Sequence, residues 1–183
     1  MTLKKIKIIA VFGIFALSFL AHFAYEVFPN IILSFFFPVN ESIWEHMKII
    51  FTCTLLYGII DYILLNKYKI KYNNFPFQLC FTALACIPIY LVIYIPLYKL
   101  LGENIFISIS VLLVTYIIGQ VISYNILKEK HIKVLNVIAV PIIITAYLGF
   151  IYLTYNPPHT YIFYDTNHHR YGIEENEKIG LHK

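Results

Sequence analysis

The sequence contains few charged side chains. Asp, Glu, Lys and Arg make up 13% of its 183 residues, whereas hydrophobic residues make up 60%. A soluble globular domain averages about 25% charged residues. The deficit lies in long apolar runs, so the composition excludes a soluble protein with a large core and indicates an integral membrane protein.

Cysteines are also few, and they lack any paired spacing. Cys53, Cys80 and Cys86 each lie inside an apolar run. This arrangement excludes a disulfide framework and a cysteine-based zinc site. We therefore expect all three to be small, buried apolar residues.

Short catalytic motifs are missing from the sequence. It contains no H-E-x-x-H, no G-x-S-x-G and no Gly-rich phosphate loop. It also lacks the internal repeat that a secondary transporter usually shows. Any functional site must therefore consist of residues that are dispersed along the chain.

Five apolar runs are long enough to cross a bilayer as helices, which takes about 20 residues each. They do not alternate as the strands of a barrel would. The runs are Ile6–Val27, Ile43–Leu65, Phe75–Leu97, Ile105–Leu127 and Val134–Tyr155. The first run continues too far to be a cleaved signal peptide. We predict an all-α fold: a transmembrane bundle of about five helices over residues 1–155, followed by a tail, 156–183.

The basic residues show which side of the membrane each end faces. Nine of the fourteen Lys and Arg residues lie at the start of the first run or between alternate runs: Lys4, Lys5, Lys7, Lys67, Lys69, Lys71, Lys128, Lys130 and Lys133. This positive-inside pattern predicts a multi-pass protein of the cell membrane with a cytoplasmic N-terminus and an extracytoplasmic tail. The net charge of +4 therefore indicates membrane lipid as a partner, and no nucleic acid.

A polar segment, "NESIWEHMK", precedes the second run. Ser42 and Glu45 match a capping box, in which Ser42 Oγ accepts the Glu45 N–H and the Glu45 carboxylate accepts the Ser42 N–H. Trp44 suits the aromatic belt, and Lys48 can extend its ammonium to the headgroups. This structural interpretation leaves Glu41 and His46 unexplained.

Histidines and acids converge on the predicted outer side. Six of the seven histidines belong there: His22, His46, His159, His168, His169 and His182. Imidazole and carboxylate together can hold zinc or a similar divalent ion, and three protein ligands with an open position form a catalytic site. The predicted metal ligands are His22, Glu26, His46 and Asp165; the predicted catalytic residues are Glu41, Glu45 and His46, with a spare glutamate as general base.

Two further contacts are expected. Asp61 is an acid inside the second run, and Gln120 or Asn125 is its expected partner. The tail is expected to dock on the outer face up to about residue 173, where Asp165 would meet Lys48 or a protonated His46.

Two segments resemble the signature of a known family. "FFFPVNESIWEHMKIIF" is similar to its N-E-S-x-W-E-H-x-K motif, and Phe163, Asp165, Tyr171 and Gly172 resemble its aromatic-x-Asp and Tyr-Gly ending. The family is an uncharacterised group of bacterial multi-pass membrane proteins. The resemblance extends from His22 to Ile173 and implies a topology but no activity.

Three functions fit these observations. We favour a non-enzymatic envelope module that binds a protein partner or lipid headgroups, because the capping box alone accounts for several of the polar residues. The alternative is a metal-dependent membrane hydrolase or transferase that acts on a lipid or envelope substrate. The third is a small transporter.

Overall fold

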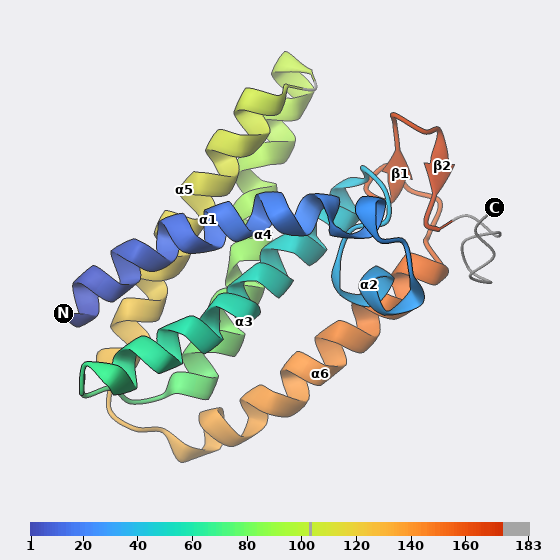
Figure 1. Cartoon of the computed structure of the whole chain (residues 1–183). Helices are drawn as coiled ribbons and strands as arrows, with labels where there is room; N and C mark the ends of the chain where they lie inside the picture. The colour runs from blue at the N-terminus through green and yellow to red at the C-terminus, as the bar shows by residue number, and fades with distance from the viewer. Residues whose placement is uncertain (103, 174–183) are drawn as a thin grey trace.

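The protein is a bundle of five long helices (Figure 1). The computed structural model describes residues 1–102 and 104–173. The elements are α1 Leu3–Val27, α2 Ile31–Phe36, α3 Ile43–Lys67, α4 Phe75–Leu101, α5 Ile105–Lys128, α6 Lys133–Tyr155, β1 Tyr164–Asp165 and β2 Arg170–Tyr171. The five long helices are long and apolar enough to cross a membrane.

The predicted all-α fold with five long apolar helices is confirmed. The short helix α2 was not predicted. Asn30 begins it, because its side-chain oxygen accepts the Leu33 N–H at 3.0 Å. Six residues are too few to stand out from the apolar sequence around them.

Helix α1 packs against α3 and α5, and α4 packs against α3, α5 and α6. Close approach of α1 and α3 requires glycine at position 13, because a Cβ there would overlap the ring of Tyr57. The core between these helices includes Cys53 and Cys86. All three cysteines are free and buried, as predicted.

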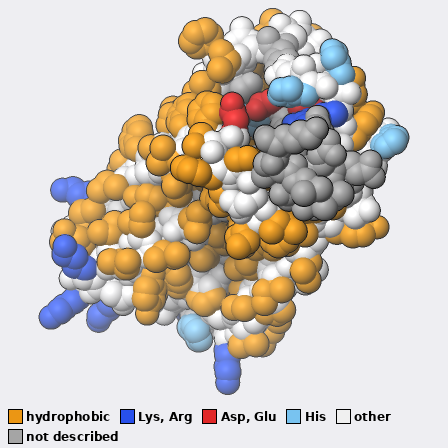
Figure 2. Space-filling view, turned by 45° about the vertical axis from the view of Figure 1, so that its right-hand side comes forward, with side chains coloured by type: hydrophobic (Ala, Val, Ile, Leu, Met, Phe, Trp, Pro, Cys, Tyr) orange, Lys and Arg blue, Asp and Glu red, His pale blue; other side chains and the backbone are white. Residues whose placement is uncertain are grey.

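Charged side chains are separated along the bundle. In Figure 2, hydrophobic side chains cover the middle of the visible face, most lysines project at one end, and acidic side chains gather at the other. The N-terminus and the β1–β2 hairpin lie at opposite ends of the bundle (Figure 1). The basic end and the hairpin end are therefore distinct surfaces.

The chain after α6 folds against the loop that precedes α3. β1 and β2 pair antiparallel, with Asp165 opposite Arg170. The Trp44 N–H donates to the Ile162 carbonyl at 2.9 Å, and the Asn40 side chain donates to the Gly172 carbonyl at 2.8 Å. Residues 156–173 thus form part of the hairpin end. The rest of the predicted tail, including His182, lies outside the described residues.

Asp61 has a different partner from those expected. The Lys7 ammonium of α1 donates to its carboxylate, and both side chains are buried. Within the described residues, neither Gln120 nor Asn125 of α5 forms a hydrogen bond with the Asp61 carboxylate. The reason is tertiary: α1 lies along α3 and brings a cation to the acid, which a neutral amide cannot neutralise.

The Lys7–Asp61 pair gives a prediction about stability. Lys7→Ala leaves the Asp61 carboxylate buried without a counter-charge, so we expect a loss of about 3 kcal/mol in the free energy of unfolding. Lys7→Met combined with Asp61→Leu removes both charges and should cost less than Lys7→Ala alone. Thermal unfolding in detergent measures both, with the exposed Lys5→Ala as control. A double variant less stable than Lys7→Ala would contradict this account.

Candidate metal site

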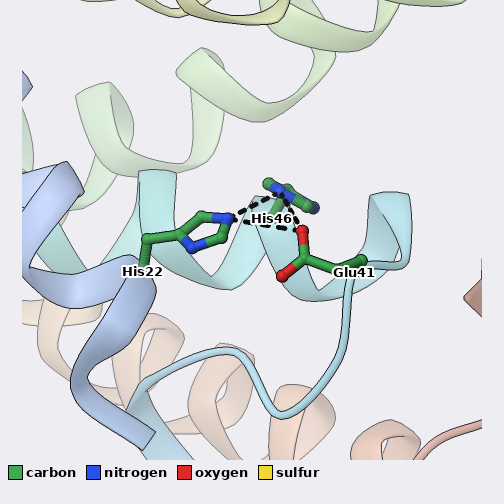
Figure 3. Close-up of side chains that lie close together, drawn as sticks. All are labelled: His22, Glu41 and His46. Carbon is green, nitrogen blue, oxygen red and sulfur yellow. Dashed lines mark hydrogen bonds and ion pairs between the residues drawn. The ribbon is translucent and has the colours of Figure 1, made fainter. Parts of the chain in front are cut away.

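Three side chains from separate segments meet at the hairpin end of the bundle (Figure 3). His22 comes from the last turns of α1, Glu41 from the loop before α3, and His46 from the first turn of α3. The two Nε2 atoms are 3.3 Å apart. Glu41 Oε2 is 3.4 Å from Nε2 of His22 and 3.6 Å from Nε2 of His46. We call these residues the His22–Glu41–His46 cluster.

The backbone of α3 selects the tautomer of His46. Its Nδ1 lies 2.9 Å from the Ser42 carbonyl oxygen. A carbonyl only accepts hydrogen bonds, so Nδ1 carries the hydrogen and the neutral ring presents a lone pair at Nε2. Metal-bound histidines usually donate their other ring N–H in this way. His22 Nδ1 is buried and has no hydrogen bond within the described chain, so no contact there selects its tautomer.

Glu41 is held by the backbone on either side of it. Its N–H donates to Asp165 Oδ2 at 3.2 Å, and the following N–H, of Ser42, donates to Asn40 Oδ1 at 2.9 Å. The hydrogen bond with His22 lowers the pKa of the Glu41 carboxyl below its ordinary value, although partial burial acts in the opposite direction. The group is therefore an anionic oxygen donor at neutral pH.

A cavity of about 310 Å³ adjoins the cluster, and all three cluster residues line it. The remaining lining comes from α1, α3, α4, α5 and the tail residue Asn167. Most of this lining is apolar, including Ile50, Tyr90 and Leu112. The cluster thus faces an internal space with hydrophobic walls.

A model of a family of unknown function, DUF6512, matches residues 1–173. The chain belongs to this DUF6512 family. No curated protein and no solved structure matches the chain. Membership confirms the family resemblance but assigns no activity. A function for this DUF6512 protein can therefore be inferred only from the geometry of its side chains.

Two of the predicted metal ligands of the DUF6512 protein lie outside the cluster. Glu26 is exposed at the end of α1, one turn beyond His22, and the three mutually close donor atoms do not include it. Asp165 is buried, and its Oδ2 is occupied by the Glu41 N–H and by His168 Nδ1 at 2.9 Å. Contrary to expectation, Asp165 forms no hydrogen bond with Lys48 or His46 within the described residues. Its role is to position Glu41.

Glu45, a predicted catalytic residue, is engaged elsewhere. Its carboxylate pairs with Lys48 Nζ at 2.6 Å and accepts from the Thr154 hydroxyl at 2.7 Å and the Val39 N–H at 3.1 Å. Lys48 is fully buried and also donates to the Ser34 carbonyl at 2.8 Å. The expectation that Lys48 reaches the headgroups is wrong, because Glu45 neutralises it inside the bundle.

One of the two hydrogen bonds of the predicted capping box is formed, and the other is replaced. Ser42 Oγ accepts the Glu45 N–H at 3.3 Å, as expected. The Ser42 N–H donates to Asn40, and not to the Glu45 carboxylate. Trp44 is half-buried and stacks on Phe163 of the tail with ring centroids 4.8 Å apart. It therefore joins the tail to α3 and is not a free interfacial anchor.

The other predicted outer histidines take part in contacts within the tail. His159 stacks on Tyr171, and His169 Nδ1 lies 3.2 Å from the Tyr164 hydroxyl. His168 pairs with Asp165. None of the three belongs to the cluster.

Asp165 gives a pH-dependent prediction. Burial raises the pKa of its carboxyl, but the hydrogen bonds from the Glu41 N–H, the His168 ring and two further N–H groups outweigh this, so the pKa is lowered. A lowered folded-state pKa means that the carboxylate stabilises the fold above its ordinary pKa, and that this stabilisation is lost as pH falls.

We expect Asp165→Asn to reduce stability at pH 7 by about 2 kcal/mol, or roughly 4–8 °C in Tm for a chain of this size. The difference from the unmodified protein should shrink below about pH 4. Thermal unfolding in detergent at both pH values measures it, with the exposed Glu26→Gln as control. A difference independent of pH would show that the charge of Asp165 does not hold the loop.

Proposed function

We propose that this protein is a multi-pass membrane protein that binds a divalent transition metal, zinc or a similar ion, at the His22–Glu41–His46 cluster. The observation that supports this is the separation of the three donor atoms, 3.3–3.6 Å. Ligands about 2.0–2.1 Å from a tetrahedral zinc ion lie roughly 3.3–3.4 Å from one another. The three atoms therefore have the spacing of three corners of a zinc coordination tetrahedron.

Hydrogen bonding alone satisfies these atoms poorly. With both imidazoles neutral, His46 Nε2 and Glu41 Oε2 are acceptors, since the hydrogen of His46 is on Nδ1. Only a hydrogen on His22 Nε2 remains to be shared between the two acceptors. A cation placed among the three atoms satisfies all of them at once, and two imidazoles with one carboxylate form a donor set that suits zinc.

The predicted orientation follows from the charge pattern. Lysines gather at the bundle end opposite the hairpin (Figure 2), and five helices are long and apolar enough to cross a membrane. If the basic end is cytoplasmic, the cluster lies near the outer surface. We propose the cell membrane as the location on this basis.

The three functions considered from the sequence now differ in support. Partner or headgroup binding by a non-enzymatic module remains a prediction, and so does transport. The hydrolase is the second candidate, because structural zinc sites use four protein ligands whereas catalytic sites use three and keep an open position. It would be tested by asking whether metal-loaded protein, but not metal-free protein, hydrolyses long-chain esters.

Metal content provides the direct test. The protein is purified in detergent, incubated with zinc and separated from unbound zinc. It should then contain about one zinc ion per chain, as measured by inductively coupled plasma mass spectrometry. His22→Ala and His46→Ala should each reduce the metal to background, because two donors do not retain the ion.

Two control variants separate this site from general damage. His131→Ala removes an exposed histidine between α5 and α6 and should leave the zinc content unchanged. Lys7→Ala breaks the buried pair with Asp61 at the other end of the bundle, so it should lower the unfolding temperature while the folded protein keeps its zinc. Equal zinc in the His46→Ala and His131→Ala proteins would refute the proposal.

A further inference from the structure

The cavity beside the cluster extends from the hairpin end toward the middle of the bundle. On α5 its lining runs from Ile105 to Leu112, and on α3 from Ile43 to Ile50. Seven residues of helix correspond to about 10 Å along the axis. The polar end of this cavity is the cluster, and its deeper walls include the buried Ile50 and Tyr90. Its volume of about 310 Å³ is at the lower end of the range for ligand pockets.

The mouth of the cavity is apolar on its outer side. Phe19 and Phe23 of α1 and Ile105 of α5 line it and are 40%, 52% and 67% exposed. These side chains lie on helices long and apolar enough to cross a membrane. A ligand that reaches the cluster past them passes over hydrocarbon-like surface, which favours an amphiphile from the bilayer over a water-soluble metabolite.

The charge at the cluster selects the headgroup. A divalent ion held by one carboxylate and two neutral imidazoles has a net charge of +1, and its fourth position is open. A monoanionic oxygen ligand placed there neutralises the site. A carboxylate meets this requirement and is small enough to leave the rest of the cavity for a single chain.

We propose that the cavity binds a single-chain amphiphile, whose carboxylate occupies the open metal position and whose hydrocarbon chain lies between α1, α3, α4 and α5. This inference rests on the proposed metal site. It adds the ligand class: a fatty acid or a compound with the same headgroup and chain.

Cobalt(II) provides a probe for the open position, because it occupies zinc sites of nitrogen and oxygen donors and its visible absorption changes with coordination. Cobalt-loaded protein in a nonionic detergent is titrated with decanoate and, separately, with acetate. Both should change the spectrum, but decanoate should be half-saturating at a concentration at least about 100-fold lower. That ratio corresponds to burial of three to four methylenes at about 0.8 kcal/mol each.

A cavity-filling variant tests where the chain lies. Ile109 lines the cavity on α5, and Val114 is exposed on the same helix outside the lining. Ile109→Trp should keep its cobalt and its response to acetate but lose the advantage of decanoate. Val114→Trp should behave like the unmodified protein, in the same detergent and therefore at the same free decanoate concentration.

The cobalt experiments distinguish failure of the metal site from failure of the amphiphile inference. Absence of bound cobalt overturns both the metal site and this inference. Cobalt that binds but does not respond to decanoate overturns the inference and leaves the metal site standing. An unchanged decanoate advantage in Ile109→Trp also overturns it, because the chain would then lie outside the cavity.

Discussion

Hydrogen bonds from both neighbouring segments fix the loop of residues 39–42, and both distances from Glu41 to the histidines of the His22–Glu41–His46 cluster depend on that loop. From α3, the Glu45 carboxylate accepts the Val39 N–H. From the tail, Asp165 accepts the Glu41 N–H, and Arg170 donates to the Val39 carbonyl at 3.2 Å. The loop has no regular secondary structure to set its path, so these contacts determine where the Glu41 side chain starts. His22 and His46, by contrast, are placed by helices.

The two glutamates of the polar segment have different functions because their surroundings differ. Glu45 is buried in the first turn of α3, where Lys48 and Thr154 satisfy its carboxylate. Removing either charge of such a pair reduces stability by more than the intact pair adds to it. Glu45 and Lys48 are therefore needed to neutralise each other, and Glu45 is not available to a ligand. Glu41 stands before the helix and is about one-third exposed. It retains a carboxylate oxygen for a ligand that arrives from outside the fold.

Local sequence features predicted the helices and part of the cap, because both depend on residues close together in the chain. Apolar run length marked all five long helices to within a few residues, and the Ser42–Glu45 spacing predicted the hydrogen bond that begins α3. The partners of Asp61 and Lys48 were missed, since they depend on which helices become neighbours. Glu26 was predicted as a ligand, yet α1 presents His22 to the cavity and leaves Glu26 exposed. Glu41 was recognised as a candidate, but only the folded loop shows it as the third donor.

The two sequence motifs that carried the family resemblance are in direct contact, and this contact connects the tail to the candidate site. Asp165 lies 124 positions from Glu41 and bonds to its backbone N–H. It contributes no donor atom to the cluster. Partners of this kind orient a ligand without touching the metal, and their loss commonly reduces metal affinity by about 10–100-fold. The tail also supplies Asn167 to the cavity wall. The candidate metal site, whose donor atoms come from α1, the loop and α3, therefore depends for its geometry on a segment that follows the last long helix.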